Sequence, residues 1–226
     1  MIRTFLTTLA LCLLAALAAA VIIFSAPPAR SDEAPRCDLA LVLANDASGS
    51  IKDHDYATMH EGIAAALRDP EVVAGLEGRR VYVMSFEFSR AERQFTVFDW
   101  TAATTEGLGH AARATETYER QTSSGDRTSF GAALRFARDQ FDRLPEPCLQ
   151  WVIDVVADGD ENSHPFAPEI LAGFSPELQV NVLAIKVYSN SNFEALRHGF
   201  GAFVVEALTW EDFPAAFRRK LLLEIM

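Results

Sequence analysis

The stretch LALVLANDASGSIKD, residues 39–53, joins an apolar run to a cluster of polar side chains. Its first six residues are apolar, which is typical of a strand buried on both faces of a sheet. The run ends in an acid and two hydroxyls at alternate positions, Asp46, Ser48 and Ser50. Alternate residues of an extended turn face the same side, and Gly49 allows a tight backbone between the serines. The stretch therefore predicts a buried strand with three oxygen-bearing side chains at its carboxyl end.

Apolar runs alternate with helical patterns along the chain, which predicts βαβ units and a mostly parallel sheet. The predicted strands are Asp38–Ala44, Arg80–Ser89, Arg93–Trp100, Leu149–Ala157, Leu178–Tyr188 and Ala202–Ala207. The second and third are close in sequence, so we expect a hairpin and one antiparallel edge strand. Helices are predicted over Asp53–Arg68, Thr104–Arg120 and Phe130–Phe141, with a last helix from the N-cap residue Thr209 and a short helical connector at 69–79. The fold class is therefore α/β, a doubly wound, mostly parallel six-stranded sheet with one antiparallel edge strand and helices on both faces.

The N-terminal part differs in composition from the rest. Arg3 precedes an apolar run over residues 5–26, and Ala18 and Ala20 form the small-residue pattern of a signal-peptidase site. At about 1.5 Å per helical residue, the run is also long enough to span a bilayer core of about 30 Å. We interpret residues 1–26 as a signal peptide or an uncleaved signal anchor, 27–36 as a Pro-rich linker and 37–226 as one exported domain. The expected location is periplasmic or secreted, with inner-membrane attachment if the segment is not cleaved.

Charge and cysteines restrict the function further. The formal net charge of −11 argues against a nucleic-acid binder, which needs a basic face. The excess of acids indicates either solubility alone or acids gathered around a cation. Cys37 and Cys148 each precede a predicted strand, and in an oxidising compartment two such thiols are expected to pair. The alternative is two buried free thiols.

Three polar segments are expected to meet at one edge of the sheet, because ligand sites in open α/β sheets lie beyond the carboxyl ends of the strands. Taken singly, each has a simpler explanation: Asp46 could cap the next helix, Thr128 could be an N-cap, and Asp158 could belong to a turn. Together they offer hard oxygen ligands, which Mg²⁺ prefers. The predicted metal-site residues are Asp46, Ser48, Ser50, Thr128 and Asp158, with Mg²⁺ or Mn²⁺ as the ion.

The stretches LVLANDASGSI, RTSFGAALRFA and WVIDVVADGDEN resemble the metal-ion-dependent adhesion site of von Willebrand factor type A domains. The order of strands and helices resembles that fold over residues 37–226. More narrowly, the chain resembles a family of exported bacterial proteins catalogued as a domain of unknown function. The resemblance implies that Ser48, Ser50 and Thr128 touch the ion, that Asp46 and Asp158 act through bound waters, and that a protein partner supplies an Asp or Glu. The expected function is a non-enzymatic, divalent-cation-dependent protein-binding module of adhesion or scaffold type.

The same residues also admit rival functions. A phosphatase of the haloacid dehalogenase type also places an acid after the first strand, but it needs a second acid where Ser48 stands. It also needs a lysine between Thr128 and Asp158, and the sequence has none there. A serine hydrolase is less favoured, because Ser48 lacks the G-x-S-x-G pattern. A third alternative is a structural domain whose metal site is vestigial. We interpret His164 as a loop residue and residues 160–162 as the rim of the site.

Overall fold

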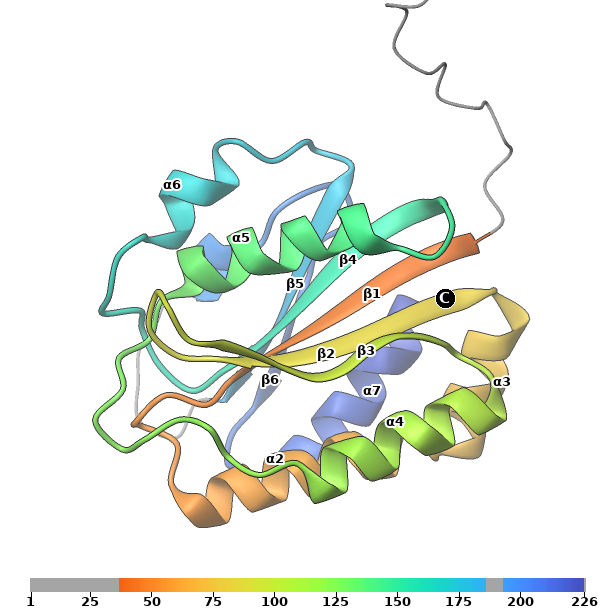
Figure 1. Ribbon diagram of the computed structural model, residues 1–226, viewed down its shortest axis with the longest axis horizontal. Coiled ribbons are helices and arrows are strands. Elements are labelled where there is room, and N and C mark those ends of the chain that lie inside the picture. Colours follow the sequence, from red (N-terminus) through yellow and green to blue (C-terminus); the bar gives the residue numbers. More distant parts are fainter. Residues whose placement is uncertain (1–36, 186–192, 226) are drawn as a thin grey trace, which may run out of the picture. The chain divides into compact units, whose positions relative to one another are not determined.

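The apolar run of the opening stretch forms strand β1 (Cys37–Asp46), which lies in the middle of a six-stranded sheet (Figure 1). The computed structural model describes residues 37–185 and 193–225. The sheet order is β3-β2-β1-β4-β5-β6. The other strands are β2 (Val81–Phe88), β3 (Gln94–Ala102), β4 (Cys148–Ala157), β5 (Leu178–Ile185) and β6 (Val204–Ala207).

Strand pairing confirms the predicted topology. Strand β1 pairs in parallel with β2 and β4, and the parallel arrangement continues through β5 to β6. Strand β3 pairs antiparallel with β2 and forms one edge of the sheet. The short connection between β2 and β3 permits only the antiparallel hairpin, because a parallel pair needs a long crossover.

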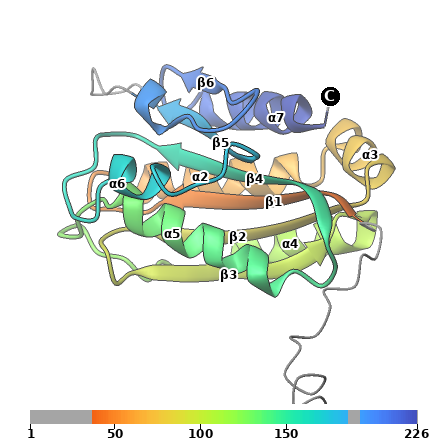
Figure 2. The same cartoon turned by 90° about the horizontal axis from the view of Figure 1, so that it is seen from above.

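Helices cover both faces of the sheet, as Figures 1 and 2 show. On one face lie α2 (Asp53–Ala66), α3 (Pro70–Gly78), α4 (Thr105–Thr117) and α7 (Phe213–Glu224). On the other lie α5 (Phe130–Gln140), α6 (Ala167–Leu171) and the short 3₁₀ turns Phe141–Arg143 and Phe193–Leu196. Strand β1 sends Leu39, Leu41 and Leu43 to the first face, and Ala40, Val42 and Ala44 to the second. This alternation follows from the two-residue period of a strand, and the burial of both faces explains the continuous apolar run.

Several predicted boundaries need correction. Helix α7 begins at Phe213 rather than at Thr209, because the Thr209 backbone N–H and hydroxyl both donate to the Asp212 carboxylate and form a separate turn. Helix α4 ends at Thr117, so Arg120 lies beyond it. The predicted connector at 69–79 is the complete helix α3, and α6 was not predicted. The predicted end of the fifth strand, at 186–188, lies outside the described residues.

Cys37 and Cys148 form a disulfide between the amino ends of β1 and β4. They are direct partners in the strand register, with Cα atoms 4.3 Å apart, and they lie 111 residues apart in sequence. The predicted pairing is therefore confirmed. The predicted N-terminal segments, 1–26 and 27–36, lie outside the described residues. Within residues 37–185 and 193–225, no helix is both long and apolar enough to cross a membrane.

Candidate metal centre

The structure brings the predicted site residues together beyond the carboxyl ends of β1 and β4. The Thr128 hydroxyl donates to Ser48 Oγ at 2.8 Å, and the Oγ atoms of Ser48 and Ser50 lie 3.2 Å apart. Ser50 Oγ donates to Asp158 Oδ1 at 2.7 Å. Asp46 joins the group through Oδ1, which accepts from the Ser48 backbone N–H at 2.8 Å. Three segments that are far apart in sequence thus present a continuous set of hydroxyl and carboxylate oxygens.

The turn after β1 has its shape because a second loop packs closely against it. The Gly49 N–H donates to the Asp126 carbonyl at 2.9 Å. A Cβ atom at position 49 would lie 2.2 Å from the Ser124 carbonyl oxygen. Only glycine allows such a close approach of two backbones. Gly49 therefore lets Ser48 and Ser50 present their hydroxyls side by side.

Thr128 is positioned by the loop that follows β4. Its N–H donates to Asn162 Oδ1 at 3.0 Å, and its carbonyl accepts from the N–H groups of Asn162 and Ser163 at 2.9 and 3.0 Å. The N-cap of α5 is Ser129, whose Oγ accepts from the Ala132 N–H. The N-cap interpretation of Thr128 is therefore wrong, and its hydroxyl is directed to Ser48 instead.

The cap interpretation of Asp46 is also wrong. Helix α2 has Lys52 at its N-cap position, with no side-chain cap hydrogen bond. Asp46 is instead completely buried at the end of β1. Its carboxylate accepts from Ser48 rather than from the first turn of the helix.

Burial dominates the electrostatics of the two acids. Burial raises the pKa of Asp46 to about 7, the negative charge of Asp158 acts in the same direction, and the hydrogen bonds from Ser48 oppose the shift. Burial also raises the pKa of Asp158, against the hydrogen bond from Ser50. Among the described residues, Asp46 Oδ2 has no hydrogen-bond partner. A buried polar atom in this state calls for an ordered water or an ion.

The donor set fits a cation that prefers oxygen. Two carboxylates and three hydroxyls meet here, with no nitrogen or sulfur atom among them. Such donors suit Mg²⁺ or Mn²⁺ rather than a soft metal. Within the described residues, no group of three or more His, Cys, Asp or Glu side chains could hold a metal. Neutral hydroxyls must therefore provide much of any coordination at this edge.

Comparison with known families identifies the chain. The family model "Protein of unknown function (DUF1194)" matches residues 36–226. The chain belongs to the DUF1194 family. No curated protein matches its sequence.

Solved structures show which fold the DUF1194 domain has. A von Willebrand factor type A protein from Catenulispora acidiphila aligns with 84% of this chain and 43% of its own, at 14% identity and a TM-score of 0.64. The mussel byssus protein PTMP1, with a zinc-occupied MIDAS motif, aligns with 85% of this chain and 49% of its own, at 18% identity and a TM-score of 0.59. The pilus adhesin SpaC from Lactobacillus rhamnosus GG aligns at 12% identity over 84% of this chain and 30% of its own, with a TM-score of 0.59.

These likenesses establish a von Willebrand factor type A fold for the DUF1194 domain, as the resemblance implied. Identities of 12–18% show the fold alone. The DUF1194 chain spans less than half the length of these three solved chains.

Sequence reasoning missed Arg120, which supports the turn after β1. Its Nη2 donates to the carbonyl oxygens of Ala47, Ser48 and Ile51 at 3.1, 3.0 and 2.8 Å. No motif surrounds Arg120 in the sequence, and its partners lie about seventy positions earlier. The signal that could have identified Arg120 from the sequence is its position just beyond the end of α4.

The predicted rim residues have different roles in the DUF1194 domain. Asn162 holds Thr128, as described above. The Glu161 carboxylate accepts from the Ala167 N–H at 2.8 and 3.0 Å, so it caps the start of α6. Asp160 is exposed. His164 is also exposed and lies 3.5 Å from the Glu169 carboxylate, away from the oxygen cluster.

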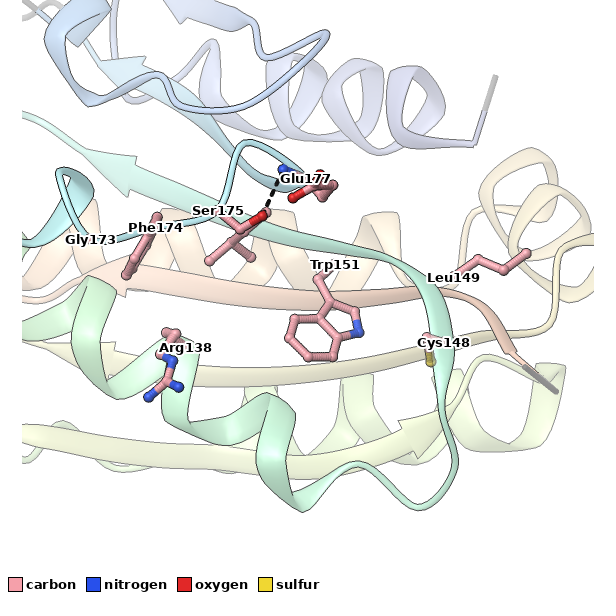
Figure 3. A pocket seen from close by; sticks show the side chains of 9 residues that line it. Arg138, Cys148, Leu149, Trp151, Gly173, Phe174, Ser175 and Glu177 are labelled. Atoms are coloured by element: carbon pink, nitrogen blue, oxygen red, sulfur yellow. Dashed lines mark hydrogen bonds between the residues drawn. The ribbon is translucent and has the colours of Figure 1, made fainter. Parts of the chain in front are cut away.

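A pocket of about 470 Å³ lies near the amino end of β4 (Figure 3). It is lined by rings such as Trp151 and Phe174 and by two opposite charges, Arg138 and Glu177. Trp151 stacks on Phe141 with ring centroids 5.0 Å apart. The pocket shares no residue with the oxygen cluster, which follows the carboxyl end of the same strand. It is therefore a separate feature of the DUF1194 domain.

Proposed function

We propose that this DUF1194 protein is an exported protein-binding module that depends on a divalent cation, Mg²⁺ or Mn²⁺. The observation that carries the proposal is the oxygen cluster, in which buried Asp46 Oδ2 has no hydrogen-bond partner among the described residues and lies beside mutually hydrogen-bonded hydroxyls. The proposed ligands are Asp46, Ser48, Ser50, Thr128 and Asp158.

The proposed mechanism follows from the chemistry of these side chains. Ser48, Ser50 and Thr128 would contact the ion through neutral hydroxyls, and Asp46 and Asp158 would act mainly through bound waters. When bound, the ion supplies a positive charge that can accept a carboxylate ligand. Ser50 is exposed while Asp46 is fully buried, so the cluster opens to solvent on the Ser50 side. A protein partner would place an Asp or Glu there.

Two further observations support an exported binding module. The Cys37–Cys148 disulfide is typical of periplasmic and extracellular proteins. One structural neighbour is named a pilus adhesin, and another is described with a zinc-occupied MIDAS motif. We propose that residues 1–26 direct export or anchor the chain in the inner membrane, and that 27–36 link this segment to the domain at 37–226.

Enzymatic alternatives find less support in the site. A serine nucleophile needs an adjacent general base. The hydroxyls of Ser50 and Thr128, which cannot act as bases, are hydrogen-bonded to Ser48 Oγ, and no histidine among the described residues is hydrogen-bonded to it. A phosphatase of the haloacid dehalogenase type needs a second acid where Ser48 stands. We therefore propose a non-enzymatic role.

Calorimetric titration with Mg²⁺ and Mn²⁺ tests the proposal directly. We expect the purified protein to bind either ion, and Asp46→Ala and Ser48→Ala to weaken binding by about tenfold or more, because each removes part of the oxygen set. Ser175→Ala, which changes a serine in the separate pocket, is the matched control and should bind normally. Circular dichroism checks that each variant is folded.

The possible results separate the alternatives. Unchanged metal uptake and partner capture in Asp46→Ala and Ser48→Ala would show that the proposal is wrong. Absence of binding in the wild type would favour the structural domain with a vestigial site. Hydrolysis of a generic phosphate ester, lost in Asp46→Ala, would favour the phosphatase.

A further inference from the structure

We propose that Arg120 is a positioning residue, which holds the turn at 47–51 in the arrangement that binds the cation. This inference rests on the proposed function. Arg120 lies beyond the end of α4, and its side chain is 15% exposed. Among the described residues, its hydrogen bonds to the turn all go to backbone carbonyl oxygens, so it acts on the ligands without replacing any of them.

The contacts of Arg120 satisfy the backbone of the turn. Its Nη2 lies within 3.1 Å of the carbonyl oxygens of Ala47, Ser48 and Ile51. The Thr122 hydroxyl donates to the same Ala47 carbonyl at 2.5 Å. These carbonyls lie in an irregular segment between β1 and α2, outside any strand or helix ladder. The Ser48 carbonyl also accepts from the Ile51 N–H at 3.2 Å, whereas the Ile51 carbonyl accepts from Arg120. Carbonyls buried without a donor are costly, so loss of Arg120 would favour a rearranged turn.

Arg120 is itself held in place from the other side. Its guanidinium lies 4.9 Å from the centre of the Tyr56 ring in α2. Nη1 donates to Asp53 at 3.2 Å and Nε donates to Thr122 at 3.1 Å. The Tyr56 hydroxyl in turn donates to buried Glu87 of β2. The sheet therefore supports the turn through a chain of contacts, from Glu87 through Tyr56 to Arg120.

A guanidinium suits this role better than an ammonium. Its planar fork lies over the aromatic ring while its N–H groups reach several acceptors at once, and less side-chain freedom is lost for each bond. Ordering the turn before the ion arrives reduces the free energy spent on ordering during binding. Removal of residues that orient metal ligands typically weakens metal affinity by about 10–100-fold.

Arg120→Gln and Arg120→Lys test the role by Mg²⁺ calorimetry on the purified protein. We expect an affinity about 10–100-fold lower for Arg120→Gln, and an intermediate value for Arg120→Lys, which keeps the charge but not the fork. The matched control is Arg218→Gln, because Arg218 pairs with Asp69 and Glu71 outside the cluster. Its affinity should equal that of the wild type.

Hydrogen exchange of the metal-free protein separates a positioning role from a merely structural one. A merely structural role would not change the exchange rates of the turn amides selectively. The amides at 49–51 should exchange faster in Arg120→Gln than in the wild type. In Arg218→Gln their exchange rates should equal those of the wild type. A general structural role would lower the thermal stability but leave the affinity of the folded protein intact.

Each outcome decides the inference. If folded Arg120→Gln binds Mg²⁺ as tightly as the wild type does, the inference about Arg120 is wrong. The proposed function would still stand in that case, because the wild type binds the ion. If Arg120→Gln does not fold, wild-type affinity in Arg120→Lys overturns the inference. Absence of Mg²⁺ binding in the wild type removes both the proposed function and this inference, and the wild-type titration alone shows that result.

Discussion

At the scale of single residues, the site depends on a carboxyl group that is out of contact with water. Asp46 is 0% exposed, and among the described residues its Oδ2 has no partner. A buried carboxylate is costly unless it is protonated or paired with a cation. Burial and the charge of Asp158 therefore raise the pKa of Asp46 to about 7. Without metal, the folded protein retains a proton on Asp46 through much of the acidic range.

This proton predicts a pH dependence of stability in the metal-free protein. Between about pH 4 and pH 7 the folded state binds more protons at Asp46 than the unfolded state, so the free energy of unfolding falls as pH rises. The contribution of the Asp46 proton to the free energy of unfolding is fully present below about pH 4 and is lost as pH rises through about 7. The upper bound of this contribution is about 4 kcal/mol. Asp46→Asn cannot titrate and should lack this component. Urea unfolding in EDTA across this range measures the difference, and equal slopes in both proteins would contradict the prediction.

At the scale of elements, helix α7 is joined to the sheet by buried charges. Lys220 is 0% exposed, and its Nζ contacts Asp154 of β4 and lies 3.0 Å from Glu224. The Glu224 carboxylate also accepts from Asn181 of β5 at 2.8 and 3.0 Å. Burial and the charge of Glu224 raise the pKa of Asp154 well above its usual value, because one ammonium faces two acids. The cluster specifies where α7 lies on β4 and β5.

Lys220→Ala should lower the free energy of unfolding by about 3–5 kcal/mol, because two buried acids lose their cation. The neighbouring Arg219 is exposed, and Arg219→Ala should change the same quantity by less than about 0.5 kcal/mol. Chemical denaturation at neutral pH measures both variants. Adding Asp154→Asn to Lys220→Ala should recover part of the loss, since it removes one unpaired acid. Equal stability of the two single variants would count against the cluster.

At the scale of the whole domain, the disulfide and the candidate site lie at opposite ends of the same two strands. Cys37 and Cys148 begin β1 and β4, whereas Asp46 ends β1 and Asp158 follows β4. Nine strand residues span about 30 Å. The disulfide can therefore stabilise the fold without contacting the oxygen cluster.

Replacing both Cys37 and Cys148 by serine should lower the free energy of unfolding by about 2–5 kcal/mol, because the closed loop is long and the unfolded chain gains freedom. Affinity for Mg²⁺ should change by no more than about twofold, since distant sites are nearly independent. Denaturation and calorimetry on the same preparations measure the two quantities. A large loss of affinity in the folded variant would show that the two ends are coupled.

The topology could be predicted from the sequence alone, and so could the proximity of the candidate site residues. A strand buried on both faces must be apolar throughout, so β1 and β4 could be recognised as apolar runs. Parallel strands have their carboxyl ends at the same edge of the sheet. Asp46 and Asp158 follow such runs, so their proximity could be predicted. Thr128 precedes a predicted helix rather than following a strand, so its simpler interpretation was an N-cap, and the structure gives that role to its neighbour Ser129.

The side chains that support the site, and the starting points of some elements, depend on contacts between distant segments and could not be predicted from the sequence. Arg120 contacts carbonyls about seventy positions away, and Tyr56 and His60 meet Glu87 in a buried cluster. Helix α7 starts at Phe213 because Thr209 and Asp212 form a turn before it. Periodicity reports only burial and local conformation. Hydrogen bonds between distant segments depend on how the helices pack on the sheet, and no local pattern encodes that packing.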